Sequence, residues 1–249
     1  MFAKERHMKI LSLVAEKRSM TVQQLTDELS ASESTVRRDL ATLDSQGMLV
    51  KVYGGAIAKG MVFTSTDDTV RQRKGHHHEA KSRIARYAAA LIEPKDFVYL
   101  DAGTTTEMMI DFITCKNAVF VTNGFSHARR LSERGFLTYI LGGEIKIPTE
   151  AVVGEEAMAS LAKYHFTKGF WGCNGISPNS GFSTPDIKEA LVKQVSMAHT
   201  QQKFVLSDAS KFSQISCVTF AAFSDATVIT AGLESGAYRK FPNIVDVAS

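Results

Sequence analysis

The stretch Ala31-Ser32-Glu33-Ser34-Thr35-Val36-Arg37-Arg38-Asp39-Leu40 divides into two faces when it is read as a helix. Val36, Leu40 and Leu43 are spaced at i, i+4 and i+7, which predicts an apolar stripe that faces a core. The other face gathers short hydroxyls and two adjacent arginines, which are side chains that contact phosphates and base edges in a DNA groove. These side chains are Ser34, Thr35, Arg37, Arg38 and Thr42. A solvated basic face without a partner is the alternative interpretation of this stretch taken alone.

Two helices are expected ahead of this stretch. Residues 3–18 place apolar side chains at steps of about four, the pattern of an amphipathic helix. Thr21, with Gln24 three residues later, forms a capping box, which predicts where a second helix begins. Ser32 is placed to cap the third helix, so a turn of about three or four residues separates the last two helices. This is the spacing of a helix-turn-helix.

A β-hairpin is expected directly after the third helix. Gly47 fits the C′ position that ends a helix. The runs Met48–Tyr53 and Ala56–Ala58 are joined by two glycines, which predicts two short antiparallel strands. Three helices followed by a hairpin describe a winged helix, in which Lys51 and Tyr53 would lie near the DNA backbone or minor groove.

Positive charge is concentrated in the N-terminal part of the chain. The formal net charge of the 249 residues is only +3. Residues 1–90 hold 15 Lys and Arg against 10 Asp and Glu, a balance of +5, whereas residues 91–249 hold 14 against 16, a balance of −2. A polyanion such as DNA would therefore meet the N-terminal domain.

The sequence predicts no membrane segment, disulfide or metal site. No apolar run approaches the roughly 20 residues that span a bilayer, and the first ten residues lack the apolar region of a signal peptide, so we expect a cytoplasmic protein. Cys115, Cys173 and Cys217 show no metal-ligand spacing and are expected to be reduced thiols. The triple histidine His76–His78 suggests a metal, but adjacent side chains point in different directions. We therefore expect exposed linker histidines, and no metal or other cofactor.

The rest of the chain alternates between strands and helices. Residues 59–78 are polar and are expected to link a DNA-binding domain over residues 3–58 to a second domain over residues 79–249. The expected strands are Phe97–Leu100, Ala118–Thr122, Leu137–Leu141, Phe204–Leu206 and Thr227–Thr230. The expected helices are Glu79–Ile92, Glu107–Ile113, Ser126–Arg134, Glu155–Tyr164 and Asp186–Thr200. This order predicts an α/β fold with a mostly parallel sheet covered on both faces.

The loops at the carboxyl ends of the strands are where such sheets bind ligands. The first strand leads into Asp101-Ala102-Gly103-Thr104-Thr105-Thr106, where a glycine allows close approach and hydroxyls and helix N–H groups can hold a phosphate. A glycine turn with a threonine cap is also a common structural feature, so this string alone leaves both interpretations open. The other loops also place a small residue beside a polar one: Asn123-Gly124, Gly142-Gly143, Gly172–Gly175 and Ser207–Phe212.

The N-terminal motifs resemble those of the DeoR-type winged helix-turn-helix repressors. Arg6, Ile10 and Val14, followed by Ser32-x-x-Thr35-Val36-Arg37-Arg38-Asp39-Leu40, match the signature of that family, and Gly47–Ala56 is similar to its wing. The resemblance implies that operator DNA is a partner. The residues expected to bind DNA are Thr21, Ser32, Ser34, Thr35, Arg37, Arg38, Lys51 and Tyr53.

The C-terminal motifs resemble the sensor domain of the same repressors. They are Asp101-x-Gly103-Thr104-Thr105, Asn123-Gly124, Gly142-Gly143, Gly154, Gly181–Thr184 and Asp208-x-Ser210-Lys211-Phe212. The resemblance implies a fold similar to ribose-5-phosphate isomerase and a phosphorylated sugar as effector. Carried over, the effector-binding residues are Asp101, Gly103, Thr104, Thr105, Asn123, Gly124, Gly143, Lys146, Asp186, Glu189, Asp208 and Lys211. The alternative is that the two lysines are surface charges and that Asp186 and Glu189 are acids at a helix N-terminus.

A finer match points to the fructose-operon branch of this family, which implies fructose 1-phosphate as the inducer. The matching stretches are Leu100–Thr106, Met109–Phe112, Val121–Gly124 and Asn174-Gly175. Repressors of lactose or tagatose use resemble the chain less in these stretches. Two winged helices would have to meet two DNA half-sites, so we expect a homo-oligomer, either a dimer or a tetramer.

An aldose–ketose isomerase is the alternative class of protein. That reaction needs a carboxylate base beside the sugar and a group that stabilises charge on the oxygen. The related isomerases carry paired acids in a loop that resembles Gly172–Gly175, which has no carboxylate here. No group is recognisably placed to activate Cys173 as a nucleophile. We therefore expect no turnover and no catalytic residue, and the winged-helix signature disfavours a sugar-phosphate binding module that does not bind DNA.

Overall fold

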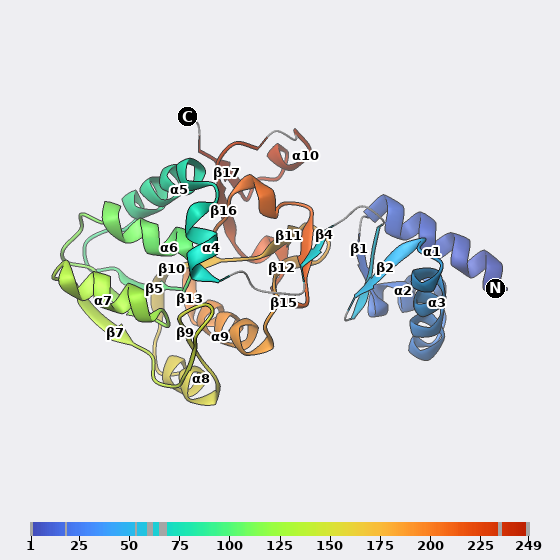
Figure 1. The fold of residues 1–249 in the computed structure, drawn as a ribbon, viewed down its shortest axis with the longest axis horizontal. Helices are drawn as coiled ribbons and strands as arrows, with labels where there is room; N and C mark the ends of the chain where they lie inside the picture. The colour runs from blue at the N-terminus through green and yellow to red at the C-terminus, as the bar shows by residue number, and fades with distance from the viewer. Residues whose placement is uncertain are drawn as a thin grey trace.

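The computed structural model of the chain describes residues 2–17, 19–52, 54–58, 62–64, 69–233 and 236–247. These residues form a small N-terminal domain and a larger C-terminal one, which lie side by side along the longest axis of the molecule (Figure 1). None of the described helices combines the length and the apolar character that crossing a bilayer requires.

The N-terminal domain consists of three helices and a three-stranded antiparallel sheet. The helices are α1 (Ala3–Lys17), α2 (Val22–Leu29) and α3 (Glu33–Ser45), and the strands are β1 (Ser19–Thr21), β2 (Leu49–Val52) and β3 (Gly55–Ala58). The strand order is β1-β3-β2. Ile10 of α1, Leu25 of α2 and Leu40 of α3 are fully buried in one core. The winged helix that was predicted from the apolar spacing is confirmed.

The predicted starts of α2 and α3 are also confirmed. The hydroxyl of Thr21 accepts a hydrogen bond from the N–H of Gln24 (3.1 Å), and the side chain of Gln24 accepts one from the N–H of Thr21 (2.9 Å). The hydroxyl of Ser32 accepts a hydrogen bond from the N–H of Thr35 (3.3 Å). These caps satisfy N–H groups that a helix cannot pair internally.

The wing is tied to α3 and to a third strand that the sequence did not predict. Gly47 ends α3 in the left-handed conformation (φ +65°), as expected of a C′ glycine. The carboxylate of Asp44 then accepts a hydrogen bond from the N–H of Lys51 in β2 (2.9 Å). Strand β1 lies so close to Gly55 that a Cβ there would be 2.2 Å from the carbonyl oxygen of Met20. The second glycine of the pair is therefore needed for β1 to join the sheet.

An ion pair joins α1 to α3. Asp39 is 5% exposed, and it accepts hydrogen bonds from the guanidinium of Arg6 (Nη2–Oδ1 3.0 Å) and from the ring of His7 (2.9 Å). Burial raises the pKa of Asp39, but the hydrogen bonds from Arg6 and His7 outweigh it, so the pKa lies below its ordinary value. Arg6, one turn before the buried Ile10 of α1, therefore connects this helix to α3.

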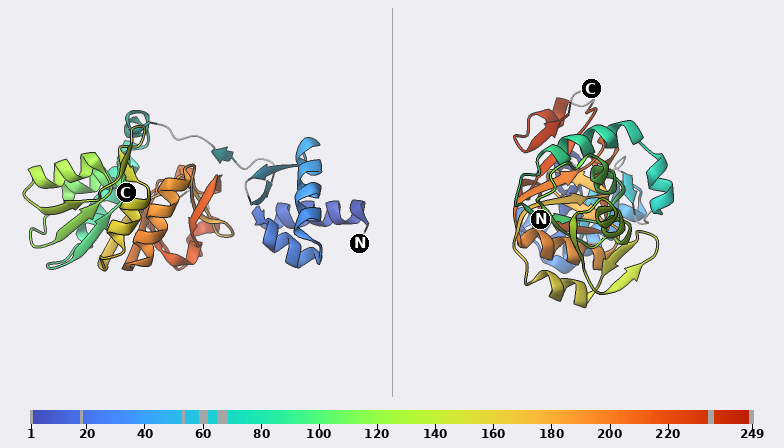
Figure 2. Two further views of the ribbon diagram at one scale, coloured as in Figure 1. Left: turned by 90° about the horizontal axis from the view of Figure 1, so that it is seen from below. Right: turned by 90° about the vertical axis from the view of Figure 1, so that its left-hand side faces the viewer.

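The C-terminal domain is built on a seven-stranded parallel sheet (Figures 1 and 2). Its order is β17-β16-β13-β10-β5-β6-β7, and each neighbouring pair is parallel. The strands are β5 (Phe97–Leu100), β6 (Val119–Thr122), β7 (Leu137–Ile140), β10 (Phe166–Gly172), β13 (Thr200–Leu206), β16 (Thr227–Thr230) and β17 (Ile244–Asp246). The predicted α/β fold is confirmed, although β10 and β17 were not predicted.

Helices cover both faces of this sheet. The longer ones are α5 (His78–Ala90), α6 (Thr104–Met109), α7 (Phe125–Glu133), α8 (Glu155–Leu161) and α9 (Ile187–Ala198). In β5, Val98 and Leu100 pack in a core with α5, α6 and α7, whereas Tyr99 between them packs in a core with α8 and α9. The alternation of side chains along a strand produces this three-layer arrangement.

Smaller elements surround the sheet. The pairs β8 (Glu144–Lys146) with β9 (Ala151–Val153), and β14 (Gln214–Ser216) with β4 (Val62–Thr64), form two-stranded sheets. The strands β11 (Gly175–Ser177), β12 (Gly181–Thr184) and β15 (Val218–Ala221) form an antiparallel sheet of their own. The remaining helices are α4 (Val70–Gly75), α10 (Gly236–Arg239), and the 3-10 turns η1 (Ile110–Phe112), η2 (Ala209–Lys211) and η3 (Phe223–Asp225).

Part of the stretch that was predicted to be a linker packs on the C-terminal domain. Strand β4 pairs with β14. Helix α4 is capped by Thr69, and its first residue, Val70, donates a backbone hydrogen bond to the carbonyl of Pro148 (3.0 Å). Residues 69–78 therefore bring polar side chains to the larger domain, which the sequence did not indicate.

Candidate functional site

A cavity of about 260 Å³ lies at the carboxyl edge of the parallel sheet. It is bordered by the residues that follow β5, β10 and β13. The chain runs from β5 to β6 and β7 on one side of this point, and from β10 to β13, β16 and β17 on the other. Such a reversal of strand order is where open α/β sheets bind their ligands.

Six of the predicted effector residues line this cavity. They are Gly103, Thr104, Thr105, Glu189, Asp208 and Lys211. The turn that carries the first three is held by Thr106, whose hydroxyl lies 2.7 Å from the carbonyl of Asp101 and 2.8 Å from that of Gly103. These contacts stabilise the turn that carries the predicted Gly-Thr-Thr loop.

One part of the cavity is strongly cationic. Arg73 from α4 and Lys81 from α5 line it together with Lys211. Lys81 is 5% exposed, and its ammonium donates a hydrogen bond to the carbonyl of Arg73 (2.5 Å). Burial lowers the pKa of Lys81, and the charges of Lys211 and Arg73 lower it further, whereas Asp208 raises it. Three cations near one carboxylate make a site that is complementary to an anion.

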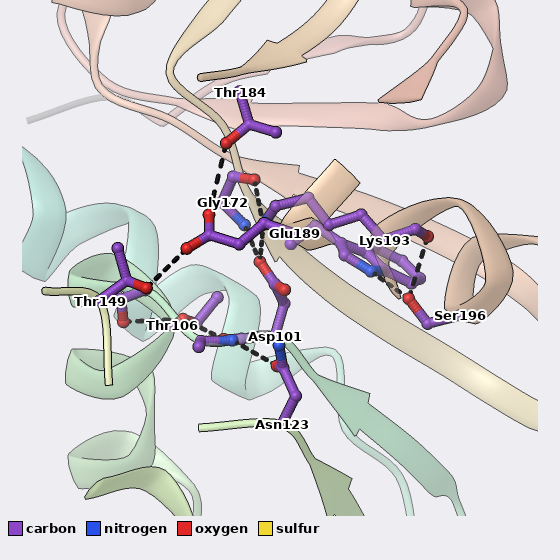
Figure 3. Close-up of polar contacts among 12 residues, drawn as sticks. Asp101, Thr106, Asn123, Thr149, Gly172, Thr184, Glu189, Lys193 and Ser196 are labelled. Atoms are coloured by element: carbon purple, nitrogen blue, oxygen red, sulfur yellow. Dashed lines mark hydrogen bonds and ion pairs between the residues drawn. The ribbon is translucent and has the colours of Figure 1, made fainter. Parts of the chain in front are cut away.

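Another part of the cavity holds a carboxylate among hydroxyls (Figure 3). Glu189 is 8% exposed, and it accepts hydrogen bonds from Thr149 (2.6 Å), Lys146 (3.1 Å) and Thr184 (3.4 Å). Lys146 also lies 3.4 Å from Asp186, whose side chain caps α9. Neither Lys146 nor Asp186 lines the cavity. Lys146 donates to the carboxylate of Glu189, and Asp186 accepts a hydrogen bond from the backbone N–H of Glu189 (2.9 Å). Both residues therefore help to position Glu189.

Asp101, which was predicted to contact the effector, forms an internal ion pair and is not among the residues that line the cavity. Asp101 is 1% exposed and accepts hydrogen bonds from the ammonium of Lys193 and from the N–H of Gly172 (3.1 Å), as Figure 3 shows. Burial raises the pKa of Asp101, and the charge of Lys193 opposes that effect. Its partner Lys193, which was not predicted as a site residue, does line the cavity.

Three other predicted effector residues shape the site without lining it. The side-chain oxygen of Asn123 accepts a hydrogen bond from the N–H of Ala102 (2.8 Å). Gly124 leaves room for His127, since a Cβ at Gly124 would be 2.4 Å from the ring nitrogen Nδ1. Gly143 has φ +139°, and a Cβ there would be 2.7 Å from a neighbouring carbonyl oxygen. These three residues shape the backbone around the cavity, and direct contact between them and the effector stays a prediction.

Several lining residues were not predicted as effector contacts. They include Arg73, His76, His77, Lys81, Thr149, Cys173, Asn174, Lys193 and Ser207. Lys193 had a usable signal, because it follows Glu189 by four residues and therefore lies on the same face of α9. Arg73 and Lys81 had none, because nothing local shows that α4 and the start of α5 fold over the cavity. Burial raises the pKa of the Cys173 thiol to about 12, so this cysteine is not a thiolate nucleophile at neutral pH.

The predicted DNA-binding face of α3 is exposed. The side chains of Ser32, Ser34, Arg37 and Arg38 are open to solvent, and Thr35 is half-buried. Arg37 pairs with Glu33 on the same helix (2.5 Å), but its side chain remains 53% exposed. Thr21 and Lys51 are also exposed. Tyr53 lies outside the described residues. In Figure 1, α3 lies on the far side of β1 from the C-terminal domain.

A buried histidine supports the Gly-Thr-Thr turn. The Nε2 atom of His127 is 3.4 Å from the N–H of Gly103, which donates to it, and 3.1 Å from the hydroxyl of Thr106. Burial lowers the pKa of His127 to about 4. An unprotonated Nε2 is required to accept the hydrogen bond from Gly103, so the turn depends on a neutral imidazole.

We expect acid to destabilise the chain through His127. The pKa of this residue is about 4 when folded and 6.5 when exposed, so the unfolded state binds more protons between these values and stability falls as pH is lowered through this window. The loss is on the order of 3 kcal/mol at most. Chemical denaturation of the wild type and of His127→Gln at pH 7 and pH 4.5 measures it. The variant should lose less stability on acidification, and an equal loss in both proteins would contradict the assignment.

Family models match most of the chain. Residues 76–232 match the DeoR C terminal sensor domain, and residues 6–60 match the DeoR-like helix-turn-helix domain. The FruR HTH-type transcriptional regulator of Bacillus subtilis (strain 168) is 41% identical over 235 residues, which cover 94% of this chain and 93% of that protein. The lactose phosphotransferase system repressor of Staphylococcus epidermidis is 30% identical over 244 residues, which cover 96% of each chain.

Among solved structures, ribose 5-phosphate isomerase A from Methanocaldococcus jannaschii matches with a TM-score of 0.41 and 12% identity over 54% of each chain. The sequence relatives above are a transcriptional regulator and a repressor, which confirms the prediction of a transcriptional regulator. The chain belongs to the DeoR family of transcriptional regulators, with a DeoR-like helix-turn-helix domain followed by a DeoR C-terminal sensor domain.

Proposed function

We propose that this protein represses a sugar-utilisation operon and is released from its operator by a sugar phosphate, with fructose 1-phosphate as the first candidate. The observation that carries the proposal is the cavity at the sheet edge, which combines a cationic part with a carboxylate and several hydroxyls. A sugar phosphate has matching chemistry, because it joins a dianion to a chain of hydroxyl groups.

The phosphate is assigned to the cationic part of the cavity. Arg73, Lys81 and Lys211 would contact its oxygens, together with the hydroxyls of Thr104 and Thr105. Guanidinium and ammonium groups make charge-assisted hydrogen bonds to phosphate, which are about twice as strong as neutral ones. Burial, and to a smaller extent the charges of Lys211 and Arg73, lower the pKa of Lys81, so a bound dianion would favour the charged form of this lysine.

The sugar is assigned to the part of the cavity around Glu189. A carboxylate accepts hydrogen bonds from hydroxyl groups, and Thr149 and Asn174 offer further polar atoms nearby. Fructose 1-phosphate is preferred because Leu100–Thr106 and Asn174-Gly175 resemble the fructose-operon branch of the family. A sugar phosphate of the lactose or tagatose pathway is the second candidate, since a lactose phosphotransferase system repressor is 30% identical over nearly the whole chain.

The DNA contacts are assigned to α3 and the wing. Arg37 and Arg38 would reach phosphates or guanine in the major groove, and Ser32, Ser34 and Thr35 would contact the backbone or base edges. Thr21 and Lys51, which are exposed, would add further contacts, and Tyr53 is proposed from the family resemblance alone. We propose that a homo-oligomer places two such domains on two half-sites, separated by one or more helical turns of DNA.

Arg38→Ala tests the DNA contacts. Loss of a bidentate guanine contact is expected to weaken operator binding by about tenfold or more, and loss of a phosphate contact would weaken binding to operator and random DNA alike. Fluorescence anisotropy with the promoter region of the protein's own gene measures both affinities. Arg129→Ala, which removes an exposed arginine of α7, is the matched control and should change neither. If Arg38→Ala binds both DNAs like the wild type, the role of this arginine is wrong.

Lys211→Gln tests the phosphate site. This change removes one cation from the cavity and keeps most of the side-chain volume, so affinity for fructose 1-phosphate should fall by roughly tenfold. Titration calorimetry gives the dissociation constants, and melting temperatures against a panel of sugar phosphates show which ligand the wild type prefers. Lys163→Gln, at an exposed position outside the cavity, should bind as the wild type does. Unchanged affinity in Lys211→Gln would place the phosphate elsewhere.

A further inference from the structure

A hairpin connects the cavity to the DNA-binding domain. It consists of β11 and β12, with Gly175 paired to Ser183 and Ser177 paired to Gly181. At its base, Asn174 lines the cavity, and the hydroxyl of Thr184 lies 3.2 Å from the side-chain oxygen of Asn174. Thr184 also contacts Glu189, as Figure 3 shows. The base of the hairpin therefore lies at the cavity.

The tip of the same hairpin contacts the winged helix. The hydroxyl of Ser180 lies 2.6 Å from the hydroxyl of Ser19 in β1, and that of Ser177 lies 3.3 Å from it. The side-chain amide of Asn179 donates a hydrogen bond to the backbone carbonyl of Lys17, the last residue of α1. Ser19 is only 2% exposed. We call these contacts of the three hairpin residues with Lys17 and Ser19 the latch.

The hairpin is held rigidly between its two ends. A Cβ at Gly175 would be 2.6 Å from the carbonyl oxygen of Gln214, and one at Gly181 would be 2.0 Å from that of Ala221. Gly181 also has φ +74°, a conformation that favours glycine. The hairpin therefore packs closely on β14 near its base and on β15 near its tip.

The latch leaves the DNA-binding face free. Strand β1 faces the C-terminal domain, whereas α3 lies on the other side of the winged helix (Figures 1 and 2). The hydrogen bonds of the latch join neutral groups, and each such bond contributes little to stability. Contacts of this kind can fix the orientation of the winged helix. A ligand that binds more tightly to a conformation without the latch can still break them.

We propose that the latch holds the winged helix in the orientation that binds the operator, and that the effector opens it. The proposal rests on the proposed function, in which Glu189 accepts hydrogen bonds from the sugar. Sugar hydroxyls would compete with Thr184 for Glu189 and bind Asn174, which displaces the base of the hairpin. The tip then separates from Ser19 and Lys17, and the two winged helices of the oligomer no longer match the spacing of their half-sites.

The double variant Asn179→Ala/Ser180→Ala tests the latch from the side of the sensor domain. Both side chains lie in the turn of the hairpin, where Asn179 is exposed and Ser180 is half-buried, so folding should be preserved. Operator affinity is measured by fluorescence anisotropy with and without saturating fructose 1-phosphate. Wild-type protein should lose affinity by a factor in the range of about 5 to 150. The double variant should bind the operator weakly even without fructose 1-phosphate. The ligand should change that affinity by less than about twofold.

One further measurement and a control variant separate the latch from damage to the cavity. Calorimetry without DNA should give the double variant the same affinity for fructose 1-phosphate as the wild type, or a tighter one, because the ligand no longer has to open the latch. Asn117→Ala/Ser224→Ala, which removes the same two side-chain types at exposed positions elsewhere, should behave as the wild type in both assays.

The outcomes distinguish this proposal from the proposed function. If the operator affinity of the wild type responds to no sugar phosphate, the proposed function fails. If the wild type responds and the double variant responds equally, only the latch is overturned. If the double variant loses affinity for fructose 1-phosphate itself, the hairpin turn shapes the cavity and the latch is likewise overturned.

Discussion

The buried ion pair between Asp101 and Lys193 fixes the parts of the sensor domain that surround its cavity. Asp101 follows β5, Lys193 stands on α9, and the N–H of Gly172 at the end of β10 binds the same carboxylate. Separating two buried charges leaves each without its partner in a medium of low polarity, which is costly. The two strands and the helix are therefore held at one mutual position. Glu189 lies one turn before Lys193 on α9, so the same pair also sets the place of the acceptor that faces the cavity.

Much of the fold could be predicted because its strands are locally apolar. The runs at β5, β6 and β16 are recognisable without any knowledge of their neighbours. Strand β10 lies at the centre of the sheet and was missed, because Lys168 and Gly169 interrupt its apolar pattern. Lys168 is buried against Asp96 (2.8 Å), and the position of a Cβ at Gly169 is filled by the ring of Trp171. Only the folded chain brings Asp96 to Lys168.

The candidate site was predictable where a residue directly follows a strand. Gly103 and Asp208 reach the cavity because the carboxyl ends of parallel strands meet at one edge. Asp101 has the same local pattern, yet its partner is Lys193, which is 92 residues away, and nothing near Asp101 in the sequence indicates that ion pair. Arg73 reaches the cavity through the packing of α4 beside Pro148, which is a tertiary contact that a polar stretch does not reveal.

In the proposed function, a sugar-phosphate site and a DNA-binding surface are coupled through a shared conformational equilibrium. Thermodynamic linkage then requires that each ligand weaken the binding of the other by the same factor. The most direct test is calorimetric titration of fructose 1-phosphate into the free protein and into the protein saturated with operator. We expect fructose 1-phosphate to bind more weakly in the presence of operator, by the same factor by which it weakens operator binding. Equal affinities in the two titrations would contradict it.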